Sequence, residues 1–147
     1  MPIQQADLHS VTGHAWQMLT GLESAPLASP LELDCQTVAF RRSVVGVRGA
    51  WAAEVCVFCP PELATMVASA MFMMDAAELT DADIDDALGE LCNVTAGGIQ
   101  SRIPGETDLT VPEHLPSVVS IDGTPHWRAD LMVEGLPVVV TVSQLEV

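Results

Sequence analysis

Lysine is absent from this sequence of 147 residues, and its only permanently basic side chains are those of five arginines. These are outnumbered by 20 acidic residues, which give a formal net charge of -15. Nucleic acid and anionic lipid are both bound through basic surfaces that neutralise phosphate groups. We therefore expect this chain to bind no nucleic acid and to dock on no membrane.

Long hydrophobic runs are also missing. The longest, such as Leu136 to Val142, have the length of a strand, whereas a membrane-spanning helix needs about 20 apolar residues. The first residues, MPIQQADLHS, carry neither the basic region nor the apolar core of a secretory signal. We therefore expect a cytoplasmic protein, in which the four cysteines are reduced thiols.

The spacing typical of metal ligands is lacking as well. Cys56 and Cys59 form a C-x-x-C pair, but side chains three residues apart on a strand point to opposite faces, and no second pair completes a zinc site. The four histidines show no i, i+4 pair. We expect these cysteines in the core and no bound metal. The alternative, a metal or redox protein built on Cys56 and Cys59, predicts bound zinc or a titratable disulfide.

Apolar residues make up 49% of the chain and are interspersed with polar ones, which favours a folded domain over disorder. The length fits one domain, residues 1–147, with no linker or repeat. Periodicity predicts helices at 6–22, 62–74 and 80 to about 103, and strands at 31–40, 43–48, 51–58, 117–121, 126–133 and 136–145. The order indicates an α+β fold with three helices and a largely antiparallel sheet of about six strands.

Turn and cap residues support these boundaries. Arg48-Gly49-Ala50 predicts a tight hairpin, and Asp122-Gly123 and Glu134-Gly135 predict turns between the later strands. Pro60-Pro61 suits the first turn of the second helix. Thr80 is positioned as the N-cap of the third helix, with Asp83 at the reciprocal place in a capping box.

The third helix carries the most informative pattern. Its apolar stripe includes Ile84, Leu88 and Leu91, and Asn93 lies almost opposite this stripe, three residues after Glu90. The residues predicted around Asn93 on the exposed side are Asp86, Gly89, Gly97 and Gln100. Each glycine costs the helix about 1 kcal/mol relative to alanine. Two interpretations remain open: a solvated face near a fraying end, or a face shaped for the close approach of a partner.

The segment Asp86-Ala-Leu-Gly-Glu-Leu-Cys-Asn-Val-Thr-Ala-Gly resembles the E-x-x-N signature helix of the CheC/CheX/FliY family of chemotaxis phosphatases. Further segments are similar to the family's hairpin, its following helix and the strand after its signature helix: Val44-Val-Gly-Val-Arg-Gly, Trp51-Ala-Ala-Glu-Val-Cys-Val-Phe, Pro61-Glu-Leu-Ala and Leu115-Pro-Ser-Val-Val. The first helix offers no second E-x-x-N at residues 13–17. A single signature is closest to CheX, so the resemblance implies a CheX-like fold and a homodimer.

The resemblance further implies a protein phosphatase whose substrate is a CheY-like response regulator phosphorylated on aspartate. The partner would bring the phospho-aspartate and its Mg²⁺, and this chain would bind no cofactor. Asn93 would orient the attacking water, and Glu90 would pair with a lysine of the partner. Asp86, Gly89, Ala96, Gly97 and Gln100 would border the partner, with small residues allowing close approach. The rival hypothesis is a non-catalytic CheX-like interaction domain that binds response regulators or flagellar-switch proteins.

Overall fold

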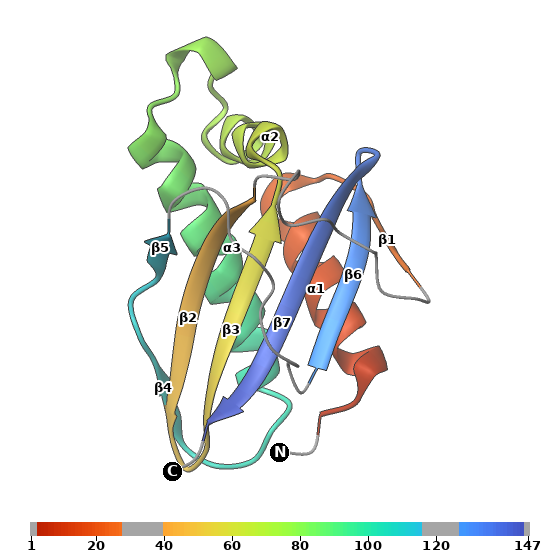
Figure 1. The fold of residues 1–147 in the computed structure, drawn as a ribbon, viewed down its shortest axis with the longest axis vertical. Coiled ribbons are helices and arrows are strands. Elements are labelled where there is room, and N and C mark those ends of the chain that lie inside the picture. The colour runs from red at the N-terminus through yellow and green to blue at the C-terminus, as the bar shows by residue number, and fades with distance from the viewer. Residues whose placement is uncertain (1–2, 28–39, 116–126, 146–147) are drawn as a thin grey trace.

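One antiparallel sheet, with its main helices on one face, organises the molecule (Figure 1). The computed structural model describes residues 3–27, 40–115 and 127–145. In chain order the elements are α1 (Gln5–Thr20), β1 (Ser24–Pro26), β2 (Arg41–Gly49), β3 (Ala52–Cys59), α2 (Pro61–Phe72), the short 3₁₀ helix η1 (Ala76–Glu78), α3 (Asp81–Gln100), β4 (Thr107–Leu109), β5 (Glu113–Leu115), β6 (Trp127–Val133) and β7 (Leu136–Leu145).

The sheet is built from two hairpins, β2–β3 and β6–β7, joined through the pairing of β3 with β7. Its strand order is β1-β6-β7-β3-β2-β4, and β5 pairs with the other end of β2. Every strand pair among the described residues is antiparallel. The predicted α+β class and antiparallel sheet are therefore confirmed.

The three predicted helices and the four long strands are present, with boundaries shifted by a few residues. The described sheet has seven strands, against the predicted number of about six. The unpredicted strands β1, β4 and β5 have three residues each, too few to show an alternating pattern. β4 and β5 lie between the predicted third helix and the strand predicted at 117–121, where no element was expected. Two predicted strands, most of 31–40 and all of 117–121, fall outside the described residues, as does the predicted turn at Asp122-Gly123.

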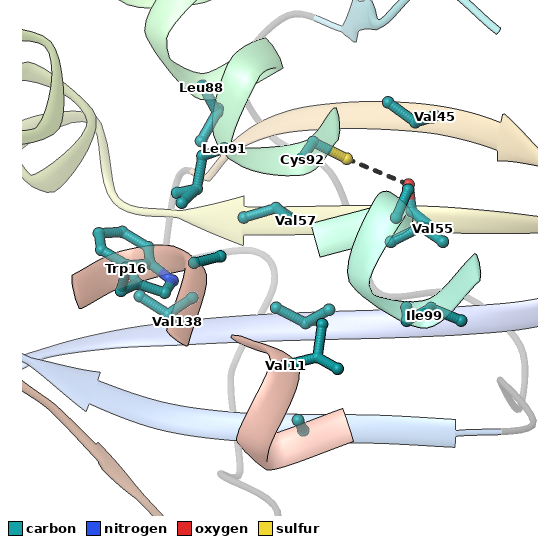
Figure 2. Packing of buried hydrophobic residues seen from close by; sticks show 14 of the residues in the cluster. Val11, Trp16, Val45, Val55, Val57, Leu88, Leu91, Cys92, Ile99 and Val138 are labelled. Atoms are coloured by element: carbon teal, nitrogen blue, oxygen red, sulfur yellow. Dashed lines mark hydrogen bonds between the residues drawn. The ribbon is translucent and has the colours of Figure 1, made fainter. Parts of the chain in front are cut away.

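The principal core lies between the sheet and the helices. Alternate side chains of the central strands point toward α1 and α3, among them Val55 and Val57 of β3 and Val138 of β7 (Figure 2). Trp16 of α1 packs into this core and is fully buried. The period of two along each strand therefore defines the face that receives the helices.

The two predicted turns between strands that lie within the described residues are confirmed. Gly49 has φ of +137°, and a Cβ there would lie 2.5 Å from the carbonyl oxygen of Glu106, so this position requires glycine. Glu134 and Gly135 both have positive φ, 51° and 75°, as a two-residue type I′ hairpin turn demands.

Within the described ranges, no helix is long and apolar enough to cross a membrane.

Candidate functional site

The start of α3 is held by the capping box that the sequence predicts. The backbone N–H of Thr80 donates to Asp83 Oδ2 at 3.0 Å, and the backbone N–H of Asp83 donates to Thr80 Oγ1 at 3.2 Å. One turn on, Arg41 of β2 donates to Asp85 Oδ1 at 3.1 Å. The helix is thereby tied to the sheet at its first turns.

Cys92 lies on the buried side of α3, against the sheet. Its thiol Sγ lies 3.3 Å from the carbonyl oxygen of Val55 and 3.5 Å from that of Ser43, and so contacts two neighbouring strands (Figure 2). Burial raises the pKa of this thiol far above its usual range, so it stays protonated and serves as a weak donor. These contacts fix the rotation of α3 about its own axis. Because successive residues are 100° apart, Asn93 then lies at the edge of the buried side.

The exposed side of α3 presents the two signature residues. Glu90 and Asp86 are exposed, Asn93 is half-buried, and Gly97 is partly exposed. Glu90 and Asn93 are i and i+3 on one helix, so they share a patch of its surface. In the part of the chain that the structure describes, neither side chain makes a hydrogen bond or an ion pair. Both are therefore available to an incoming molecule.

The predicted border of this patch needs correction at two positions. Gly89 and Ala96 are buried, so neither lies on the accessible surface as expected. The buried arc of α3 runs from Ala87 round to Gly89, so it is wider than the predicted stripe and extends over both small residues. The repeat of Leu88, Cys92, Ala96 and Ile99 at steps of four, four and three residues carries this information in the sequence.

Gln100 has a structural role that the sequence did not reveal. Its side-chain amide Nε2 donates to the carbonyl oxygen of Thr107 at 2.7 Å and to the hydroxyl of Thr107 at 2.9 Å. These bonds fasten the end of α3 to β4, beside the edge of the sheet. Gln100 thus holds the position of the exposed helix face, and its amide nitrogen is engaged within the chain.

Gly97 and Gly98 are adjacent but have different surroundings. A Cβ added at Gly98 would lie 2.6 Å from Val11 Cγ1 of α1, so this glycine allows the two helices to pack closely. A Cβ added at Gly97 would meet no atom within 4 Å. The fold has no steric need for glycine at position 97, although glycine costs about 1 kcal/mol of helix stability. This supports the interpretation that the exposed face receives a partner.

Both cysteines of the C-x-x-C pair lie on β3. Cys59 is buried and Cys56 is half-buried, and both are free thiols there. Burial raises the pKa of Cys59 to about 12. Among the described residues, no group of three or more His, Cys, Asp or Glu side chains is placed to hold a metal ion.

The family model described as chemotaxis phosphatase CheX matches residues 42–125, more than half of the chain and all of α3. The chain belongs to the CheX family. The sequence resemblance to this family is thereby confirmed. Among proteins of curated function, none matches the chain significantly.

Solved CheX structures share the fold of this CheX-family chain. A CheX from Vibrio vulnificus superposes with a TM-score of 0.76 at 14% identity, covering 95% of each chain. A CheX from Desulfovibrio desulfuricans gives 0.73 at 16% identity, covering 95% of this chain and 97% of the other. The CheX in a CheX–CheY–BeF₃–Mg²⁺ complex from Borrelia burgdorferi gives 0.69 at 15% identity, covering 99% and 100%. At such identities these likenesses establish the fold.

Proposed function

We propose that this CheX-family protein is a phosphatase that hydrolyses the aspartyl phosphate of a CheY-like response regulator. The observation that carries the proposal is the exposed side of α3, where Glu90 and Asn93 stand together with no partner among the described residues. Membership of the CheX family supports it, as does the Borrelia burgdorferi complex, in which a CheX is paired with CheY, BeF₃ and Mg²⁺.

Asn93 supplies the catalytic group in this proposal. Hydrolysis of an acyl phosphate proceeds through a loose transition state, so positioning an in-line water is the main task left to a second protein. A carboxamide both donates and accepts hydrogen bonds and does not titrate near neutral pH, which suits it to hold that water. Because Asn93 is half-buried at the margin of the helix, its side chain has less freedom than a fully exposed one.

Glu90 orients the partner. Its exposed carboxylate is placed one turn before Asn93 and accepts from a lysine of the regulator near the phosphoryl group. The regulator brings the phospho-aspartate and its Mg²⁺, and this chain binds no cofactor. Gly97, one turn after Asn93, leaves bare helix backbone against which the partner can sit.

The roles are separated by measuring binding and turnover in the same variants. Asn93→Ala is expected to lower the maximal dephosphorylation rate at least about 100-fold, while the Kd for the BeF₃-loaded regulator changes little. Glu90→Ala is expected to raise that Kd and to lower the rate at subsaturating regulator. Glu62→Ala, which removes an exposed carboxylate of α2 outside the patch, serves as control. An Asn93→Ala variant that retains the parent rate contradicts the proposal.

A further inference from the structure

The helix pair α1–α3 encloses a second feature beside the proposed site. A groove of about 380 Å³ runs between the two helices. Its α1 wall carries Ser10, Val11 and His14, its α3 wall carries Val94 and Gly98, and Arg102 lines it just after the end of α3. Val11 is buried and forms part of the floor, whereas Ser10, His14 and Arg102 are exposed at the rim.

The charge of this groove differs from that of the rest of the molecule. The chain carries 20 acidic residues, yet none of the described residues that line the groove is acidic. Arg102 at its end has a 40% exposed side chain and lies 4.0 Å from the nearest carboxylate oxygen, that of Asp7. At this distance the pair is weak and surface-exposed, so the guanidinium can accept a second anionic partner.

The groove is continuous with the face that presents Asn93. Val94 and Gly98 both line the groove, and each directly follows a residue of the exposed face, Asn93 or Gly97. Gly97 lies on the surface of α3 between Asn93 and the groove. It carries no side chain, and a Cβ added there would meet no atom within 4 Å. A body seated on Asn93 therefore reaches the groove across Gly97 without meeting a protruding side chain.

We infer that the α1–α3 groove is a second contact for the same response regulator, and that it takes an apolar side chain of the regulator flanked by an acidic one. The apolar group rests on Val11 and Val94, and the acidic group pairs with Arg102. This inference rests on the proposed function, because it places the regulator on the Asn93 face. The pattern predicts a basic group on the regulator at Glu90 and an acidic one on the order of 18 Å further along the helix axis.

The contact is tested by the Kd for CheY-like regulators of the same genome, each loaded with BeF₃ and Mg²⁺. His14→Asp places a carboxylate in the groove, where it repels the acidic group, and Arg102→Gln removes the cation that pairs with it. Gln17→Asp makes the same kind of change in an exposed α1 side chain that does not line the groove. Ser10→Trp fills the groove, and Gln17→Trp is its control. The two charge variants are expected to weaken binding about threefold to fivefold more than Gln17→Asp. Ser10→Trp is expected to weaken it about tenfold, with the maximal rate kept.

The outcomes separate this inference from the proposed function. If the parent protein binds and dephosphorylates a regulator but the groove variants match their Gln17 controls in Kd, the inference is overturned and the proposed function stands. If no regulator binds the parent protein, both are overturned. Hydrogen exchange on the parent protein gives a readout that needs no variant: the bound regulator is expected to protect residues 10–15 and 94–102, and unchanged exchange there contradicts the groove contact.

Discussion

At the scale of single residues, the fold treats Asn93 and Glu90 differently. Asn93 borders the buried arc of α3, so its place is fixed by the packing of the neighbouring Cys92. Glu90 stands fully on the exposed side, where a long carboxylate can adjust to a partner. This difference agrees with the proposed roles, in which Asn93 positions the reacting water and Glu90 aligns the two proteins.

Alanine at position 97 and alanine at position 98 are expected to change the stability of the fold in opposite directions. Gly97→Ala is expected to raise the free energy of unfolding by about 0.5–1 kcal/mol, since open space surrounds its Cβ. Gly98→Ala is expected to be less stable than Gly97→Ala by about 1–3 kcal/mol, because its Cβ would overlap Val11. Urea denaturation of both variants measures this difference, and equal stabilities would contradict the packing described for α1 and α3.

A larger side chain at position 97 separates stability from function. Gly97→Gln is expected to fold with at least the stability of the parent and to lose affinity for the regulator, because the side chain occupies the space where the partner sits. Gln17→Ala, on the exposed side of α1, is the control. A Gly97→Gln variant with the affinity of the parent would show that no partner approaches Gly97.

The buried thiols lead to a prediction of chemical reactivity. Burial raises the pKa of Cys59 to about 12 and that of Cys92 still further. The thiolate form of both residues is therefore negligible at about pH 8. Native protein treated with iodoacetamide at that pH is expected to leave both residues unmodified, and urea-unfolded protein is expected to be alkylated at both. Mass spectrometry of the peptides measures this, and rapid modification of native Cys92 would contradict its place against the sheet.

At the scale of elements, the presence and start of α3 were the easiest features to predict, and the side of the helix that packs on the sheet was the hardest. The capping residues Thr80 and Asp83 and the turn at Glu134-Gly135 act locally, so the sequence alone predicted them. The burial of Gly89 and Ala96 depends on which side of α3 meets β2 and β3. Small residues are compatible with either side, so the repeat that includes Cys92 and Ala96 indicates their burial only weakly, and the contact of the helix with the sheet decides it.

The edge of the sheet shows the same limit. β4 and β5 exist through pairing with β2, at Val47–Gly49 and at Arg42–Val44. Their own three residues carry no hydrophobic alternation that could identify them. The bond from Gln100 to Thr107 joins α3 to this edge, and it too becomes visible only once the strand is in place.

The N-cap of α3 provides the prediction at this scale. Thr80→Ala removes the oxygen that accepts from Asp83 and is expected to cost about 1 kcal/mol, which lowers Tm by about 2–4 °C. Thr80→Ser keeps the hydroxyl and is expected to remain close to the parent. Differential scanning calorimetry measures both, and an unchanged Tm for Thr80→Ala would contradict a stabilising capping box.

At the scale of the whole molecule, charge and fold act together. A net charge of -15 is unsuited to nucleic acid, and the exposed part of α3 adds to it through Asp86 and Glu90. A regulator that docks there is therefore expected to present a basic group at Glu90. The groove adjoins this face, and none of the described residues that line it is acidic, so the two surfaces together favour one orientation of the bound partner.

The expected oligomeric state is also a property of the whole chain. The resemblance to single-signature CheX proteins leads us to propose a homodimer. Sedimentation equilibrium is then expected to give twice the chain mass of 15.6 kDa at micromolar concentration. A mass of one chain across the concentration range would contradict the dimer, and it would leave the surface of α3 and its proposed chemistry unaffected.

The most direct test of the central claim is multiple-turnover decay of a phosphorylated CheY-like regulator mixed with a substoichiometric amount of this protein. An enzyme is expected to empty the whole regulator pool faster than spontaneous hydrolysis, with each molecule acting many times, and Asn93→Ala is expected to return the decay to the spontaneous rate. A regulator that binds the protein but decays at its spontaneous rate would contradict the account and favour a non-catalytic interaction domain.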